Sequence, residues 1–308
     1  MELIKPDINV DFVGRRRLAF IASIALILVG LVSLIAHGGP EYGVDFAGGT
    51  LVQLRFDENT DAAQLKQLLV PEPLPSAVIQ QFGDEANEFL IRAQVTDSGL
   101  QGLRSAILSR LEASYGAGKV DLRRIEMVGP QVGKELREKG LLAILYAMIG
   151  ILAYITWRFE FRFAVGAIVA LMHDVLLTLG AFSLFGKEID LPIIAAFLAI
   201  IGYSLNDTII VYDRIRENMA RHHKDDFSRV VNRSINETLS RTLLTSGTTL
   251  LVVLALFVFG GGVIHNFAFA LLVGVVVGTY SSIFVASPIL IAWQNRAGTS
   301  KKTVAHEA

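Results

Sequence analysis

The chain has 308 residues, of which 52% are hydrophobic, and its mean hydropathy is +0.50. This hydrophobic content exceeds what one soluble core requires and indicates that most of the chain lies in a lipid bilayer. The net charge of -1 gives no argument for a nucleic-acid partner, and none is expected; without cysteine, disulfides and thiolate metal sites are excluded.

Six apolar runs are each long enough to cross a bilayer as a helix, which takes roughly 18 residues or more. They lie at 18–36, 140–157, 163–185, 190–212, 243–259 and 266–293. The first run follows three arginines and resembles a secretory signal, but it is longer than a usual signal core and five further runs follow it. We therefore predict an α-helical membrane protein with six transmembrane helices.

Lysine and arginine in short loops predict the orientation, because they are retained on the cytoplasmic side. They precede the first span, separate the second from the third, follow the fourth and close the chain, whereas the opposite loops, 186–188 and 260–266, hold one lysine. Both termini, 1–17 and 296–308, are therefore expected in the cytoplasm. Residues 37–139 would then be exported, and 140–295 would form a five-helix bundle with a cytoplasmic loop at 213–242.

The exported segment has the expected order βαββαβ. Its strands are predicted at 42–56, 77–82, 88–95 and 121–128, and its helices at 61–69 and 99–115. This order folds most simply as a small α+β, ferredoxin-like domain with both helices on one face of the sheet. From 131 to 139 the chain becomes charged and is expected to run as a helix into the second span.

A motif with paired glycines, Asp45 to Thr50, interrupts the first predicted strand and contains Gly48 and Gly49. Such glycines allow a bulge or the close approach of another backbone. A kink that lets the strand leave the membrane surface is favoured over a ligand site. The motif is not a phosphate loop, because neither GxGxxG nor GxxxxGKS spacing is present.

Two polar pairs lie inside expected spans: His173 with Asp174 in the third, and Asn206 with Asp207 in the fourth. A carboxylate in hydrocarbon is costly, so such a residue usually faces a bundle interior and marks an ion or proton path. Hydrogen bonding between helices is the simpler alternative, at about 1 kcal/mol per polar side chain, but serine or asparagine would suffice for it. We predict a proton-linked role, first for Asp207 and then for His173 and Asp174.

Arg241 lies at the start of the fifth span, where an arginine is an ordinary cytoplasmic flanking residue. The functional alternative is that its guanidinium approaches the deprotonated carboxylate of Asp207. Small residues such as Gly202, and the GxxxG spacing of Gly274 and Gly278, let helices approach closely and receive no specific role. HExxH, GxSxG and nucleotide-loop patterns are missing, so no enzyme activity, cofactor or metal is expected.

Together these motifs resemble the SecF family of protein-export membrane proteins, within the SecD/SecF group of the RND superfamily. The segments that carry the resemblance are 44–50, 173–174, 202–208, 213–218 and 236–242. It implies a SecD partner in a pseudo-symmetric twelve-span unit, association with the SecYEG channel and with YajC and YidC, and a secreted polypeptide as substrate. It also implies a bacterial inner-membrane location, use of the proton motive force after the ATP-dependent stage, and a proton pathway that includes Asp207 and Arg241.

Two other functions stay open on the residues alone. The chain could be an RND-type proton-coupled exporter of small molecules, or a passive module that holds other translocation subunits together. A small-molecule pump would ordinarily need a second six-span half and a wide apolar cleft. A passive module would use its buried polar pairs only for packing.

Overall fold

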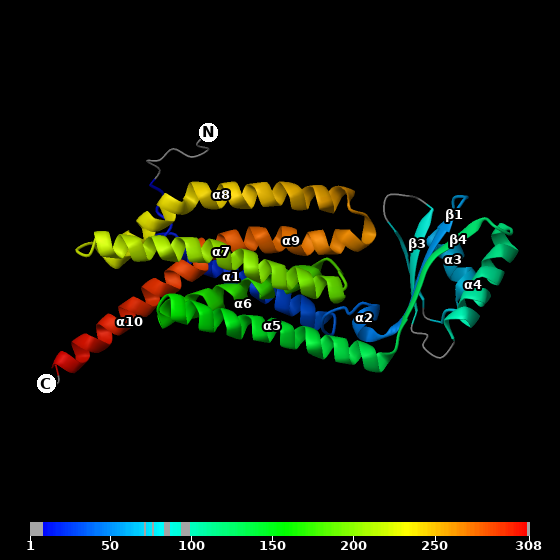
Figure 1. Ribbon diagram of the computed structural model, residues 1–308, viewed down its shortest axis with the longest axis horizontal. Coiled ribbons are helices and arrows are strands. Elements are labelled where there is room, and N and C mark those ends of the chain that lie inside the picture. Colours follow the sequence, from blue (N-terminus) through cyan, green and yellow to red (C-terminus); the bar gives the residue numbers. More distant parts are fainter. Residues whose placement is uncertain (1–8, 71, 76, 83–86, 94–98, 307–308) are drawn as a thin grey trace.

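The computed structural model describes residues 9–70, 72–75, 77–82, 87–93 and 99–306. It consists of a bundle of long helices with a small sheet domain at one end (Figure 1). Within these described ranges, six segments are helical, long and apolar enough to cross a membrane: Arg16–Ala36 (α1), Pro130–Arg158 (α5), Phe161–Leu184 (α6), Leu191–Arg221 (α7), Phe227–Phe259 (α8) and Ile264–Arg296. The predicted six spanning segments are therefore all helical.

The last spanning segment is not a uniform α-helix. It joins α9 (Gly261–Ser281), a five-residue π-helical segment, η1 (Ser282–Ala286), and the first part of α10 (Ser287–His306). A π-helical segment inside an α-helix is uncommon and is often found at functional sites. Here it follows directly after Ser281, whose hydroxyl takes part in the buried polar site described below.

Most of 213–242, the segment expected on the cytoplasmic side, is helical. α7 continues through it to Arg221 and α8 begins at Phe227, so 222–226 connect the two helices. Asp226 caps α8, because its carboxylate accepts a hydrogen bond from the Ser228 amide at 3.0 Å. The apolar run ends where charged residues begin, but the helical hydrogen bonds continue past that point. α5 begins at Pro130, which confirms that 131–139 run as a helix into the second span.

The described part of the sheet domain contains four antiparallel strands in the spatial order β2-β3-β1-β4. These are β1 (Gly49–Phe56), β2 (Val78–Gln81), β3 (Glu88–Ala93) and β4 (Val120–Val128), with helices α3 (Ala62–Leu69) and α4 (Leu100–Tyr115). Alternate residues of β1 and β3 are buried against apolar residues of both helices, so α3 and α4 cover the same face. The other face is turned toward the bundle (Figure 1).

The first strand begins later than expected, because the short helix α2 (Val44–Ala47) precedes it. Gly48 and Gly49 follow with φ angles of 78° and 128°, a region that favours glycine. A Cβ on Gly48 would lie 2.9 Å from the Cα of Pro130, where the chain leaves the sheet domain. The paired glycines therefore permit the close backbone approach expected from the sequence, at the point where the chain's entry into the domain and its exit meet.

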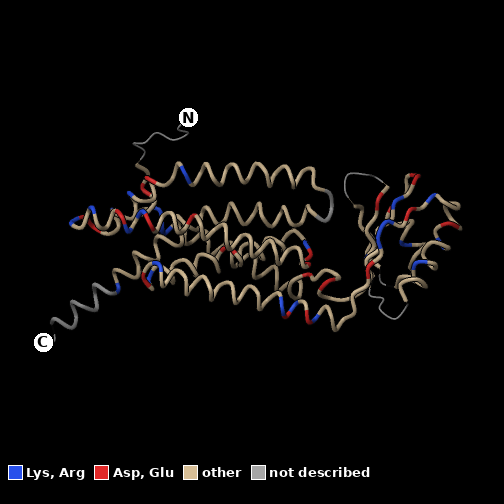
Figure 2. The backbone as a smooth tube through the Cα atoms, viewed as in Figure 1, with Lys and Arg blue, Asp and Glu red and all other residues tan. Residues whose placement is uncertain are grey.

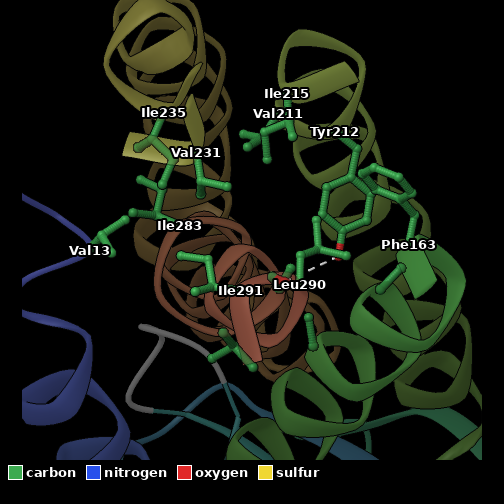
Figure 3. Packing of buried hydrophobic residues seen from close by; sticks show 14 of the residues in the cluster. Val13, Phe163, Val211, Tyr212, Ile215, Val231, Ile235, Ile283, Leu290 and Ile291 are labelled. Atoms are coloured by element: carbon green, nitrogen blue, oxygen red, sulfur yellow. Dashed lines mark hydrogen bonds between the residues drawn. The ribbon is translucent and has the colours of Figure 1, made fainter. Parts of the chain in front are cut away.

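Charged residues gather at the two ends of the bundle and in the sheet domain, while the middle of the bundle is almost free of them (Figure 2). The end away from the sheet domain, called here the far end, has an apolar core. It packs Phe163 of α6 against Tyr212 of α7, with ring centroids 5.1 Å apart. The Tyr212 hydroxyl donates to the Ala286 carbonyl of η1 at 3.3 Å (Figure 3). This core holds α6 and α7 against the irregular segment of the last span.

Candidate functional site: buried carboxylates in the helix bundle

Asp207 lies on the buried face of α7 and is 0% exposed. Buried residues recur along α7 at helical spacing, among them Ser204, Asp207 and Val211, so the carboxylate points into the bundle as one member of an otherwise largely apolar stripe. Asn206 is one residue earlier and therefore about 100° around the helix, and it is exposed. The structure thus separates two neighbours that the sequence presented as a pair.

The polar environment of Asp207 consists of hydroxyl groups. Its Oδ2 accepts a hydrogen bond from Ser246 of α8 at 3.3 Å, and the Ser246 hydroxyl shares a second bond with Thr279 of α9 at 2.7 Å. Among the described residues, Oδ1 of Asp207 and the hydroxyl of Thr242, one helical turn before Ser246 on α8, have no hydrogen-bond partner. A buried polar atom without a partner is costly, so this site satisfies the carboxylate only in part.

Arg241 is exposed on α8, and within the described part of the chain it forms no ion pair with Asp207. It is near enough for its charge to act on that carboxylate. The two residues are therefore not in direct contact here, and the approach of the Arg241 guanidinium to deprotonated Asp207 in one conformation stays a prediction.

Asp174 forms a second and much better satisfied site. It is 1% exposed, and its Oδ2 accepts hydrogen bonds from Ser204 of α7 at 2.5 Å and from Ser281 of α9 at 2.8 Å. Its Oδ1 lies 2.9 Å from Nδ1 of His173, whose Nε2 lies 3.0 Å from the hydroxyl of Ser23 in α1. Asp174 and His173 together connect four helices, α1, α6, α7 and α9.

The two carboxylates are separate in space but share supporting elements. Ser204 and Asp207 are three residues apart on one face of α7, and Thr279 and Ser281 are two apart at the end of α9. A change in the packing of α7 against α9 at one carboxylate must therefore affect the other. No role beside the carboxylates was predicted for these serines and threonines from the sequence, because their partners lie on other helices.

The GxxxG glycines of the last span pack within this chain. A Cβ on Gly278 would lie 2.9 Å from the Cβ of Ser204, and one on Gly274 would overlap the side chain of Ile200. They allow α9 to approach α7 closely beside both carboxylates. Gly202, in contrast, is exposed on α7 with open space around its Cα.

Segments 213–218 of α7 and 236–242 of α8, which contain Arg214 and Asn236, meet at the far end of the bundle. The carboxylate of Glu237 accepts bonds from Arg214 at 3.0 Å and from Asn218 at 2.8 Å, which tie α7 to α8. Asn236 binds the backbone of Val10 through both its side-chain atoms, at 2.8 and 2.9 Å. These residues therefore have a structural role: they hold α7 against α8 and fix the segment before α1.

Removing the Asp174 side chain should destabilise the bundle. Asp174→Ala leaves the Ser204 and Ser281 hydroxyls and the His173 ring without their shared acceptor, and each unsatisfied buried group costs on the order of 1–3 kcal/mol. We expect a lower midpoint of thermal unfolding in detergent, followed by intrinsic tryptophan fluorescence. Asp174→Asn is the control, since its amide oxygen can still accept from both serines. Equal midpoints for Asp174→Ala and the unmodified protein would contradict a structural role for this site.

Two family models match the chain. "Protein export membrane protein SecD/SecF, C-terminal" matches residues 108–296, and "SecD/SecF GG Motif" matches residues 33–60, which include Gly48 and Gly49. The first match covers all the helices that carry the two buried carboxylates. The second covers the point where the chain enters the sheet domain.

Relatives of similar length are described as "Protein translocase subunit SecF". The one from Magnetococcus marinus is 50% identical, and the match covers 100% of this chain and 99% of that relative. The one from Vibrio alginolyticus is 44% identical, and the match covers 94% of this chain and 91% of that relative. The crystal structure of SecDF from Thermus thermophilus, a translocon-associated membrane protein, matches with a TM-score of 0.84 at 40% identity. That match covers 95% of this chain but only 40% of the SecDF chain, so this chain corresponds to less than half of that protein. The chain therefore belongs to the SecD/SecF family of protein-export membrane proteins, as a SecF-type protein translocase subunit.

Proposed function

We propose that this chain pairs with a SecD subunit and that the pair uses the proton motive force to drive late steps of polypeptide export across the bacterial inner membrane. The observation that carries the proposal is Asp207, a fully buried carboxylate that is only partly satisfied by hydrogen bonds. Gain and loss of a proton by such a group can favour different helix packings. By linkage, this drives motion only as far as the two packings differ in proton affinity.

The exposed face of α7 supports a second membrane subunit. It presents small or polar residues at helical spacing, namely Ala195, Ala199, Gly202 and Asn206. Small residues let another helix approach closely, and an asparagine facing lipid is costly, so a partner helix that covers Asn206 lowers that cost. In the SecDF structure a chain more than twice as long contains the part that matches this one, which agrees with a partner of comparable size.

The proposed orientation places the far end of the bundle, with its arginines, in the cytoplasm and the sheet domain in the periplasm. Asp207 and Arg241, supported by Asn206, Asp174 and His173, form the proposed proton pathway. The antiparallel order β2-β3-β1-β4, with both helices on one face, supports a ferredoxin-like domain. Beyond SecD, we propose association with the SecYEG channel, YajC and YidC, and a secreted polypeptide as substrate.

Purification of the tagged chain from native membranes in mild detergent tests the pairing. We expect a SecD-type six-span companion in stoichiometric amount, identified by mass spectrometry. Recovery of the chain alone would contradict the proposal, and so would a companion of some other type. Substitution of Asn206 by leucine is the matched variant, since a bulky side chain in the small-residue stripe should reduce recovery of the companion without unfolding this subunit.

A further inference from the structure

The sheet domain is held to the bundle by the loop between α6 and α7, residues 185–190, called here the α6–α7 loop. The Ile189 amide donates to the Glu41 carbonyl at 2.7 Å, and the Gly43 amide donates to the Ile189 carbonyl at 2.9 Å. One residue into α7, the Leu191 amide donates to Asp45 at 3.0 Å. The segment that leads into the sheet domain is therefore hydrogen-bonded to the segment that leads into α7.

A side chain from the sheet itself reaches the same loop. β3 buries Phe89 and Ile91 against α3 and α4, so Arg92 projects from the opposite, helix-free face. There Arg92 forms an ion pair with Glu188, and the two side chains are only 21% and 20% exposed. Arg92 also donates to Gln80 of the neighbouring strand at 3.3 Å, which orients its guanidinium.

A cavity of about 400 Å³ separates the sheet from the bundle beside this ion pair. A domain with a cavity beneath it has room to move, so the contacts at its edge determine its position. The charged and titratable residues that line the cavity are Asp45, Arg92, Arg124, Glu126, Lys187, Glu188, Asp190 and His265. Burial, the carboxylate of Glu41 and that of Asp190 raise the pKa of Glu188, while Arg92 acts in the opposite direction.

The α6–α7 loop is rigidly connected to Asp207 through α7. Asp190 caps that helix, since its carboxylate accepts a hydrogen bond from the Ile193 amide at 3.2 Å. Asp207 is 17 residues further along (207 minus 190), which corresponds to ~25 Å at ~1.5 Å per residue. An unbroken α-helix transmits displacement along its length, so a change of packing at Asp207 must move the cap and the loop joined to it.

We propose that the Arg92–Glu188 ion pair is the contact through which movement of α7 is transmitted to the sheet domain. Arg92 and Glu188 are positioning residues in this scheme and do not themselves exchange protons with Asp207. The inference rests on the proposed function, because it supplies the mechanical connection between the buried carboxylate and the exported domain. The proposed pairing with a SecD subunit does not depend on this inference.

Exchanging the two charges tests the ion pair, because the double variant should restore what each single variant loses. Arg92→Glu and Glu188→Arg should each reduce gradient-dependent export about 5-fold or more, the lower end of typical coupling between sites. The double variant, which restores opposite charges, should recover most of the loss. The control is the exposed pair Lys119 and Glu58, 3.1 Å apart within the sheet domain, whose exchange should have no effect. Single variants with full activity, or a double variant no better than either single one, would overturn the inference.

A chemical cross-link tests whether a connection at this contact is enough for transmission. The chain has no cysteine, so Arg92→Cys with Glu188→Cys provides a single reactive pair for a short bis-maleimide. The double-cysteine variant lacks the ion pair and should show reduced gradient-dependent export; the cross-linker, which rejoins β3 to the α6–α7 loop, should restore more of that export than a mono-maleimide does. Equal export by the two treated forms would refute transmission through this contact. A different result would contradict the proposed function: an Asp207→Asn variant whose export still responds to the gradient.

The ion pair should also respond to pH on the side of the sheet domain. Because the pKa of Glu188 lies above its ordinary value, Glu188 takes up a proton at a higher pH than an ordinary exposed glutamate does. A neutral Glu188 no longer attracts Arg92, so spin labels on the sheet domain and on the α6–α7 loop should move apart as the pH is lowered. Glu188→Gln should show the longer distance at every pH tested. A distance that is constant in the unmodified protein would count against the inference.

Discussion

Asp207→Asn should abolish the response of polypeptide export to the proton gradient while the protein remains folded and inserted. Asparagine has nearly the same shape and can still accept the hydrogen bond from Ser246, but it cannot gain or lose a proton. Coupling between two sites is typically worth about 1–3 kcal/mol, so the stimulation of export by the gradient should fall by roughly 5- to 150-fold. The measurement compares export into inverted membrane vesicles with and without an imposed gradient.

The control for this prediction is Asp213→Asn, the same substitution on the same helix. Asp213 lies at the exposed far end of α7, 3.8 Å from Arg158, and its substitution should leave the gradient response intact. Matched amounts of inserted protein are required for both variants. A gradient response of normal size in the Asp207→Asn protein would show that Asp207 is a packing residue and that the chain is closer to a passive assembly module.

Gly180→Val should prevent α1 from packing on α6. A Cβ on Gly180 would lie 2.9 Å from the Cα of Gly30, and one on Gly30 would lie 2.8 Å from the Cα of Gly180. These neighbours are backbone atoms, which cannot rotate away as a side chain can, so the helices must separate. Separation would break the Ser33–Ser183 hydrogen bond of 2.8 Å and weaken the contact between Ser23 and His173. Overpacking of this kind costs about 1–3 kcal/mol or more.

The yield of monodisperse protein and its thermal unfolding midpoint in detergent measure this effect. Gly150→Val is the matched control, because the structure leaves open space around Gly150 of α5. We expect a large decrease in both quantities for Gly180→Val and a small change for Gly150→Val. Similar midpoints for the two variants would mean that the close contact between α1 and α6 is not required for stability.

The elements of this protein were largely predictable, because each follows from a local pattern. A run of about 20 apolar residues leaves the backbone no hydrogen-bond partners in lipid except its own, which makes a helix the stable form. Alternating apolar residues and turn signals likewise predicted the strands and helices of the sheet domain in their observed order. The exception was α2, which occupies part of the predicted first strand. The helices α7 and α8 also extend beyond their apolar runs, because charge ends an apolar run but does not end a helix.

The site was predictable only in part. An aspartate inside a spanning segment is conspicuous in any sequence, which is why Asp207 and Asp174 were identified. Their partners were not, because the bonds between Ser204 and Asp174 and between Ser246 and Asp207 join residues 30 and 39 positions apart in different helices. No sequence spacing distinguishes these serines from others in the same spans.

The amino-acid sequence by itself determined that the chain has six apolar helices, a small α+β domain after the first, and carboxylates within the spans, because hydropathy, periodicity and the position of a charge in an apolar run are local properties. Only the tertiary structure decided that Asp174 is fully hydrogen-bonded while Asp207 is not, that Asn206 faces outward, and that Arg92 meets Glu188. Each of these depends on how helices and strands far apart in the chain pack together, and the free energy of that packing is not contained in any single segment.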